Sequence, residues 1–436
     1  MAATLTATTV EQLAKRFKEP SWLAEARAAA LRRHAELPWP HASDEIWRRT
    51  DISVFDPARS AGVLIDDGLL KSAQVSQQTL ERIQPLGAEH LVVRINGEWT
   101  SRQVPSGVMA TDLASALRDR GDVIRQVIEA DGLTPSEQKL ASLNLAFHHD
   151  AVFIEIPAGF QSEEPIRLVR LLSALPGISL FPLTMIVIGA GSTVTIIQED
   201  LSASSGPSGP AHVINGRVEL WLEPHANVRY CRVQQWDAAS HEFALQRATL
   251  HEAAELSMVN IHVGGRISKT HVIAKLVGRQ ATSRVFGFLF GHGDQHLDYH
   301  SLQDHQAPQT MSDLLYKAAL KDQSRMIYTG LIRIAKAAKQ TDAFQANHNL
   351  LLSQGAKAET IPMLEILADD VRCKHGATVG PVDEEQLFYL MTRGIPRTLA
   401  ERLLVMGFVE PVLEQVPFEP LRDRLREELE GSLQAA

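Results

Sequence analysis

The chain has 436 residues, of which 44% are hydrophobic and 22% charged, and its formal net charge is −9. This composition can bury a sizeable core and indicates two or three domains, whereas the negative balance argues against nucleic-acid binding, which relies on clustered Lys and Arg. Two cysteines give no disulfide framework, no apolar run approaches the roughly 20 residues that span a bilayer, and the start lacks an apolar signal core, so we expect a cytoplasmic chain without nucleic-acid or membrane partners.

Residues 1–150 predict a mixed, mostly helical region. Alanine-rich residues 8–36 favour a helix. In residues 91–101, LVVRINGEWTS, the pair Asn96-Gly97 stands between alternating apolar residues, which is typical of a β-hairpin. Residues 112–130 and 135–149 then predict two further helices.

From residue 151 to about residue 380 the pattern changes to closely spaced short strands. Segments such as AVFIEIP, TVTIIQE, RVELWLE and SRVFGFLFG are separated by Gly, Pro, Asn or Asp, and no helix-length periodic segment interrupts them. This pattern predicts an all-β block. A sandwich, a barrel or a solenoid would each fit its length and spacing.

One segment of this block, GHGDQHLDYHSLQDH, is a candidate metal site. It contains His292, His296, His300 and His305 beside Asp294, Asp298 and Asp304. Whether it folds as a helix or a strand, several of these side chains share one face, as a divalent cation would require. The competing interpretation is a polar sheet face with structural hydrogen bonds, and no HExxH arrangement supports a metalloprotease.

Two further observations limit the chemistry of the block. Cys231 lies in the middle of the predicted strand VRYCRVQQW, where we expect a small buried apolar residue. No GxxxxGK[ST] phosphate loop occurs in the sequence, so any ATP that the function needs should be hydrolysed by another protein.

The second cysteine belongs to a Cys-x-His pair, Cys373 and His375. In a strand these two residues project from the same face, and thiolate with imidazole suits zinc, iron and iron-sulfur chemistry. The flanking Arg372 and Lys374 should lower the pKa of the thiol. Because tetrahedral metals take about four ligands, the remainder must come from a second chain, a distant residue or water. The alternative is a buried cysteine beside a surface histidine.

Residues 381–436 predict a helical domain. Asp383 with Gln386 forms a capping-box start, and the final helix carries Leu421, Leu425 and Leu429 at intervals of four. This leucine stripe must pack on something. It either packs on the preceding helices of the same chain or forms a docking face for another subunit.

Three segments resemble the SufB/SufD family, the scaffold components of the SUF iron-sulfur cluster assembly system. Residues 350–395 resemble the family's carboxy-terminal signature, and CKHGATVG looks like its SufD member. DAFQANHNLLLS resembles a DAYQ-N-NLLLS segment, with Phe344 in place of tyrosine, and PWPHASDEIWRRTDIS resembles the amino-terminal P-E-W-R-T-D pattern.

The resemblance implies a β-helix for residues 151–380, flanked by the mostly helical region 1–150 and the helical domain 381–436. It also implies a non-catalytic scaffold that pairs with SufB through its β region and binds the ATPase SufC through its C-terminal helices, where Leu421, Leu425 and Leu429 are the candidate contacts. His375, with Cys373, would hold a transient iron-sulfur cluster shared with SufB, and the isolated chain would carry no tightly bound cofactor. A homodimer is an alternative state of the chain alone.

Two other functions stay open on the sequence. A β-helix enzyme acting on polysaccharide would need a charged groove along the solenoid. A purely structural interaction protein would tolerate changes at both Cys373 and His375.

Overall fold

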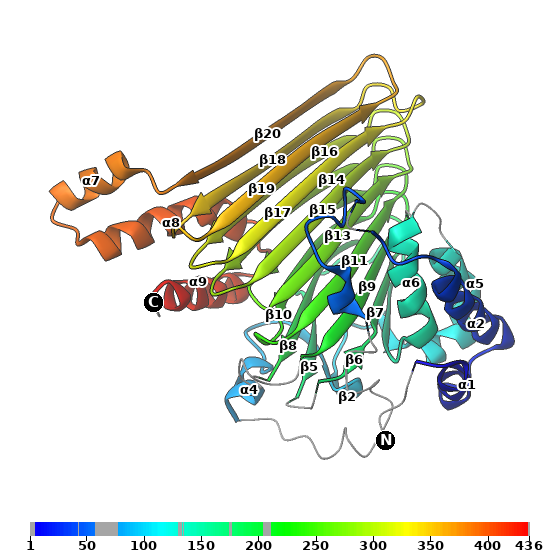
Figure 1. The fold of residues 1–436 in the computed structure, drawn as a ribbon. Helices are drawn as coiled ribbons and strands as arrows, with labels where there is room; N and C mark the ends of the chain where they lie inside the picture. The colour runs from blue at the N-terminus through cyan, green and yellow to red at the C-terminus, as the bar shows by residue number, and fades with distance from the viewer. Residues whose placement is uncertain are drawn as a thin grey trace.

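The structure is a computed structural model that describes residues 5–41, 43–56, 77–129, 133, 135–173, 177–203 and 211–434. In these residues the fold is mainly β, with a central solenoid, a helical N-terminal region and C-terminal helices, which confirms the predicted fold class (Figure 1). None of the described helices is long and apolar enough to cross a membrane.

The helices are α1 (Ala7–Arg16), α2 (Ser21–Glu36), the 3-10 helix η1 (Ile52–Phe55), α4 (Gln77–Arg82), α5 (Leu113–Glu129), α6 (Pro135–Phe147), α7 (Glu384–Thr392), α8 (Arg397–Leu413) and α9 (Glu419–Gln434). The strands are β1 (His90–Ile95), β2 (Glu98–Arg102), β3 (Met109–Asp112), β4 (Asp150–Ile156), β5 (Ile166–Leu172), β6 (Ser179–Leu180), β7 (Pro182–Ile188), β8 (Thr193–Ser202), β9 (Val213–Leu222), β10 (Asn227–Gln235), β11 (His241–Leu250), β12 (Glu255–His262), β13 (Ile267–Leu276), β14 (Thr282–Gly291), β15 (His296–His305), β16 (Met311–Leu320), β17 (Arg325–Ile334), β18 (Asp342–Leu351), β19 (Lys357–Ile366) and β20 (Arg372–Pro381).

The solenoid consists of two facing sheets between which the chain alternates. Sheet B has the strand order β2-β1-β5-β8-β10-β12-β14-β16-β18-β20. Sheet A has the order β19-β17-β15-β13-β11-β9-β7-β4-β3. From β7 onward, each strand pairs in parallel with the strand two positions later, so equivalent residues of successive coils form straight rows. One such row on sheet B runs Leu314, Gln345, His375.

The interior between the sheets is apolar over most of its length. Its core combines inward rows of both sheets, including Val228, Leu256, Leu314 and Met326. Tyrosines fill the later coils. Gly330 leaves room for them, because a Cβ atom at this position would lie 2.7 Å from the hydroxyl of Tyr328.

The N-terminal region covers the outer face of sheet A. The helix predicted over residues 8–36 is two helices, α1 and α2, separated by a turn in which Lys18 has a φ of 51° and Pro20 precedes α2. The predicted hairpin is confirmed, because β1 pairs antiparallel with β2 and both Asn96 and Gly97 have positive φ. This hairpin joins sheet B and β3 joins sheet A, so the two sheets begin before residue 150.

The C-terminal helices α8 and α9 cover part of the outer face of sheet B. Leu421, Leu425 and Leu429 are buried there against Val259, Phe288 and other outward residues of the strands. This contact corrects the prediction that the three leucines form a docking face for a partner, because their own chain already covers them. A partner of this domain must use other residues.

Candidate functional site

Cys373 and His375 lie on β20, the last strand of the solenoid. His375 continues the row of Leu314 and Gln345, and Cys373 lies in register with Ala343, so both side chains are on the inward face of sheet B. Gln345 and Ala343 are buried, whereas His375 is exposed and Cys373 is partly buried. The difference arises because no further coil of the described chain covers β20. The predicted strand and the shared face are therefore both present.

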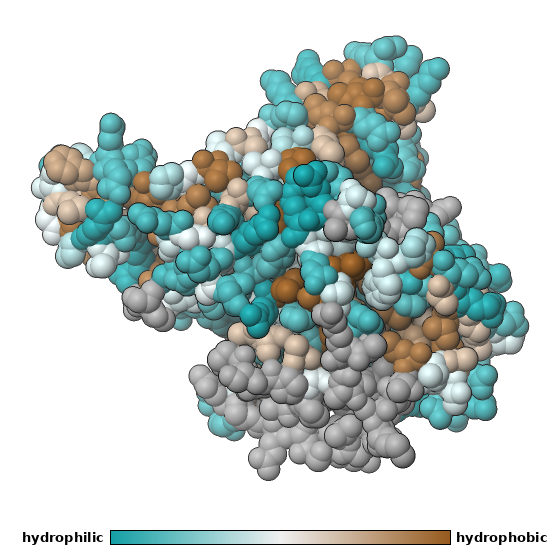
Figure 2. Space-filling view, viewed as in Figure 1, coloured by the Kyte–Doolittle hydropathy of each residue, from teal (hydrophilic) through white to brown (hydrophobic). Residues whose placement is uncertain are grey.

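The solenoid ends in an open coil. Strands β19 and β20 are the edge strands of their sheets, each paired on one side only within the described residues. The inward row of β19 is likewise uncovered at Leu364 and Ile366, and Leu367 after the strand is 61% exposed. Figure 2 shows the resulting hydrophobic patch at the top of the view, over the connection between β19 and β20. Exposed edges beside apolar surface are typical of a surface that another chain covers.

The electrostatics of Cys373 differ from the prediction. Burial raises the pKa of its thiol, and Asp342 acts in the same direction. Arg372 and Lys374 alternate with Cys373 along the strand, so their side chains lie on the opposite face and do not lower this pKa. The thiol is therefore protonated at neutral pH in the isolated chain.

The pair alone does not complete a metal site. Among the described residues, no group of three or more His, Cys, Asp or Glu side chains is arranged to hold a metal ion. Cys373 and His375 offer one thiol and one imidazole at the open end, which can serve as part of a coordination sphere. A metal ion bound there would need its remaining ligands from outside this surface.

The four histidines of the candidate metal segment, residues 291–305, lie on different faces of β15 or outside it. His296 and His300 share the outer face of β15 with Asp298, as the alternation predicted. His292 precedes the strand, and His305 faces inward, where its ring nitrogens contact Thr310 Oγ1 at 2.8 Å and Ser312 Oγ at 2.9 Å. The four histidines therefore do not converge.

The part of this segment that does converge is a buried ion-pair network. Lys269 Nζ lies 2.5 Å from Asp298 Oδ2 and 3.0 Å from His300 Nε2, and it donates to the carbonyl of Ile46 at 2.7 Å. Although burial raises the pKa of Asp298, Lys269 and His300 hold that pKa well below its usual range. The ammonium group of Lys269 therefore lies between Asp298 and His300, where a metal ion bound by these two side chains would have to lie. We interpret the network as the attachment of residues 46–50 to sheet A, where it is buried rather than solvated.

Cys231, the other cysteine, lies in an environment that suppresses the reactivity of its thiol. Cys231 lies on the outward face of sheet B beneath the C-terminal helices and is fully buried, as predicted for a small apolar residue. Burial raises the pKa of its thiol far above the ordinary value. Thiolate chemistry at this position is therefore suppressed in the folded chain.

The sequence interpretation missed one exposed surface. Helix α7 extends away from the solenoid (Figure 1, orange, left), and its large apolar side chains Phe388, Tyr389 and Met391 are exposed, with Phe388 at 67%. Leu403 of α8 is also exposed. The five consecutive residues LFYLM were the available signal, because a helix in contact with one neighbour cannot bury apolar side chains on every side.

Comparison with known proteins accounts for nearly the whole chain. Residues 9–168 match the family described as "SufBD protein N-terminal region", and residues 172–408 match "SUF system FeS cluster assembly, SufBD core domain". A Staphylococcus epidermidis protein named "Iron-sulfur cluster assembly SufBD family protein" is 25% identical over 445 residues, which cover 98% of this chain and 94% of the relative.

Two Bacillus subtilis proteins are similar to about the same degree. "Iron-sulfur cluster assembly protein SufD" is 25% identical over 426 residues, covering 95% of each chain. "Iron-sulfur cluster assembly protein SufB" is 24% identical over 449 residues, covering 98% of this chain and 94% of the relative. These identities do not distinguish the two types.

Proposed function

The chain belongs to the SufBD family of iron-sulfur cluster assembly proteins, and from this premise we propose that it is a SufD-like scaffold subunit. It works with a SufB-type chain and an ABC-type ATPase of the SufC kind, and it does not itself catalyse a reaction. The SufD-like assignment rests on the sequence of residues 373–380, CKHGATVG, because overall identity to the SufB and SufD relatives is nearly equal.

One observation carries the proposal: Cys373 and His375 lie side by side on the inward face of the last strand, at the open end of the solenoid. A thiol and an imidazole placed there cannot complete a cluster site alone, and a second chain seated on this end would bring further ligands to them. The iron-sulfur cluster is then the cargo of the complex, held transiently, and the isolated chain binds iron weakly.

Cys373 and His375 would act as ligands of iron. A cysteine binds iron as the thiolate, so Cys373 must release its proton, whereas His375 binds as the neutral imidazole through a ring nitrogen lone pair. Because burial raises the pKa of Cys373, bound iron has to drive this deprotonation.

The SufB-type chain would pair with the open coil. The edges of β19 and β20 offer backbone donors and acceptors, and Leu364, Ile366 and Leu367 offer apolar surface beside them. In the absence of that partner, a second copy of this chain could use the same surface, which gives the homodimer considered from the sequence.

The ATPase would bind the exposed apolar surface of α7 and α8. Phe388, Tyr389, Met391 and Leu403 present uncovered aromatic and aliphatic side chains, whereas the leucines of α9 do not. ATP hydrolysis would belong to that partner, because this sequence has no phosphate loop.

The experiment is anaerobic co-purification with a SufB-type chain and the ATPase, followed by counts of iron and acid-labile sulfide. We expect His375→Ala to abolish cluster formation, with unchanged folding and unchanged recovery of the ATPase. His348→Ala is the matched control, because His348 lies on the outward face of the neighbouring strand, where it contacts Thr378. A wild-type content of cluster in both the His375→Ala and Cys373→Ser variants would overturn the proposal and favour a purely structural subunit. No observation favours polysaccharide chemistry.

A further inference from the structure

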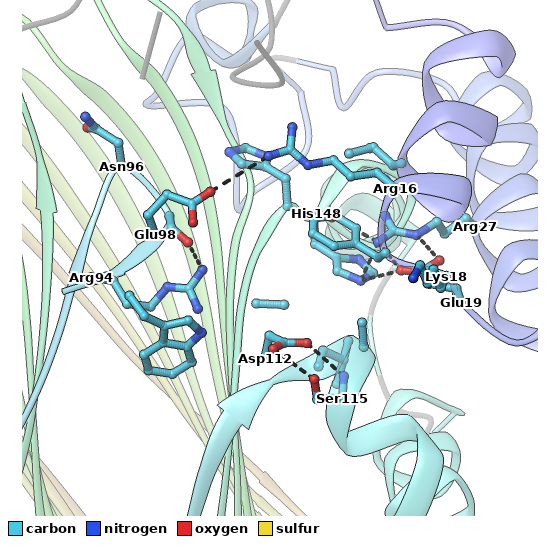
Figure 3. Close-up of a pocket in the computed structure, with 18 of the residues that line it drawn as sticks. Arg16, Lys18, Glu19, Arg27, Arg94, Asn96, Glu98, Asp112, Ser115 and His148 are labelled. Atoms are coloured by element: carbon cyan, nitrogen blue, oxygen red, sulfur yellow. Dashed lines mark hydrogen bonds and ion pairs between the residues drawn. The ribbon is translucent and has the colours of Figure 1, made fainter. Parts of the chain in front are cut away.

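A second candidate site lies far from the open end, in a cavity of about 500 Å³ between the N-terminal helices and the β1–β2 hairpin. Figure 3 shows its walls: Arg94, Asn96 and Glu98 come from the hairpin, Arg16 from α1, Lys18 from the turn that follows it and Arg27 from α2. Asp112 comes from the end of β3 and Ser115 from the first turn of α5. The cavity shares neither Cys373 nor His375 and has no part in the proposed cluster site. Its size is in the usual range for small-molecule pockets.

The wall at Arg94 is the end of a chain of buried ion pairs. Arg94 Nε lies 2.7 Å from Asp150 Oδ1, and Arg170 Nε lies 2.6 Å from the other carboxylate oxygen. The chain continues into the solenoid through Asp200, at 2.8 Å from Arg170, and Arg232, at 2.7 Å from Asp200. Each inner arginine lies between two carboxylates, because Arg232 also contacts Glu242 at 2.6 Å. Arg94 forms an ion pair with one carboxylate only, that of Asp150, among the described residues, while Glu98 and Asp112 act on it without an ion-pair contact.

Arg94 also lines the cavity. The residue is 3% exposed, its Nη2 donates to the carbonyl of Gly97, and its Nη1 is buried without a hydrogen-bond partner among the described residues. Burial lowers the pKa of Arg94, and the carboxylates of Asp150, Glu98 and Asp112 only partly offset this effect, so the cation is incompletely compensated. A buried unpaired donor costs free energy that an acceptor in the cavity would recover.

The other charges of the wall leave a positive excess. The carboxylates are occupied: Glu19 pairs with Arg27 at 2.7 Å, Glu98 lies 3.8 Å from Arg16, and Asp112 accepts from the backbone and side chain of Ser115. In contrast, no carboxylate of the described residues forms an ion pair with Lys18 or with Arg118, which donates to Ser115 Oγ at 3.2 Å. His148 and His149 add no charge at neutral pH, because burial lowers the pKa of both.

We propose that this cavity binds a small molecule through an oxyanion group, carboxylate or phosphate, which the guanidinium of Arg94 attracts at its inner end and Lys18 and Arg118 hold at its rim. Charge-assisted hydrogen bonds from a buried guanidinium are the strongest that a neutral-pH site offers to either group. Trp99 reports on the site, since the guanidinium carbon of Arg94 lies 4.5 Å from its ring centroid.

The test is titration of the full chain with inorganic phosphate and, separately, with succinate, followed by calorimetry and by tryptophan emission. Trp99→Phe identifies the emission change that belongs to this cavity. We expect saturable binding of at least one anion, and the preferred anion assigns the group as phosphate or carboxylate. The double variant Lys18→Ala/Arg118→Ala should weaken that binding about tenfold with an unchanged melting temperature.

The matched control is Arg229→Ala/Lys336→Ala, which removes the same charge from exposed positions of the solenoid. It should bind the anion like the wild type. Absence of saturable binding of both anions would overturn the proposal, and so would equal weakening in the two double variants, which would show only nonspecific attraction to net charge.

Discussion

His375 lies directly beside Gln345 in the parallel ladder between β20 and β18, on the same inward face, yet Gln345 is 1% exposed and His375 is exposed. The two positions are equivalent in successive coils. What distinguishes them is that another strand follows β18 and none follows β20 in the described residues. The candidate ligands are accessible because no further coil of the described chain covers β20.

The two cysteines should differ in reactivity. In the native isolated chain, we expect iodoacetamide to modify Cys373 and to leave Cys231 unmodified until the chain unfolds, because Cys231 is fully buried beneath α8 and α9. Since the pKa of Cys373 is raised, its reaction should be slower than that of an ordinary thiol at neutral pH and should accelerate as pH rises. Peptide mass spectrometry measures both sites. Preferential labelling of Cys231 would contradict this assignment.

The two exposed apolar surfaces should bind different partners. Leu367→Glu, at the open coil, should weaken pairing with the SufB-type chain and leave recovery of the ATPase unchanged, whereas Leu403→Glu, on α8, should do the reverse. Both side chains are exposed, so each variant should change the free energy of unfolding by no more than about 0.5 kcal/mol. Pull-down with each partner measures the effects. Loss of both partners in either variant would contradict separate surfaces.

The leucine stripe of α9 should behave as core. Leu421→Ala removes a fully buried side chain and should lower the free energy of unfolding by about 2–5 kcal/mol, since the packed helices and strands cannot fully close the cavity. Denaturant titration followed by circular dichroism measures the change. A near-neutral effect on stability with loss of ATPase binding would restore the docking role that the sequence suggested.

Gly330 should be required for the interior packing of the last coils. A Cβ atom there would lie 2.5 Å from Gln345 Oε1 and 2.7 Å from the hydroxyl of Tyr328, so Gly330→Ala should cost about 1–3 kcal/mol of stability. Gly376→Ala is the control, because its Cβ atom would meet nothing within 4 Å. Thermal melting of the two variants should differ clearly, and equal melting temperatures would show that the interior adapts without cost.

Acid should destabilise the fold through its buried histidines. Burial lowers the pKa of His300 to about 3 and of His305 to about 4, whereas the unfolded chain titrates near its ordinary value of about 6.5. Below about pH 6.5 the unfolded state therefore binds more protons, and the free energy of unfolding falls as pH falls, by up to about 1.4 kcal/mol per pH unit for each such histidine. His305→Gln should flatten this dependence by about one proton in urea titrations between about pH 7 and about pH 5. An unchanged slope would contradict a neutral buried His305.

The sequence predicts the strand alternation, the hairpin at Asn96-Gly97 and the Cys-x-His pair because each depends on local periodicity or turn chemistry. The same alternation puts Arg372 and Lys374 on the opposite face of β20 from Cys373, so the expectation that they lower its pKa did not agree with the predicted strand. The sequence could not decide between the two roles of the α9 leucines, because a buried stripe and a docking stripe have the same spacing. The cavity at Arg94 combines residues that are distant in sequence and carries no local signal.

The connection between β20 and α7 is very short. Only Val382 and Asp383 separate the end of the strand at Pro381 from the first turn of the helix, and Asp383 caps that helix by accepting from the backbone of Glu385 and Gln386. A connection this short cannot absorb a displacement of the helix. A force on α7 is therefore transmitted through the main chain to β20, which carries the thiol and the imidazole and pairs only with β18 among the described strands.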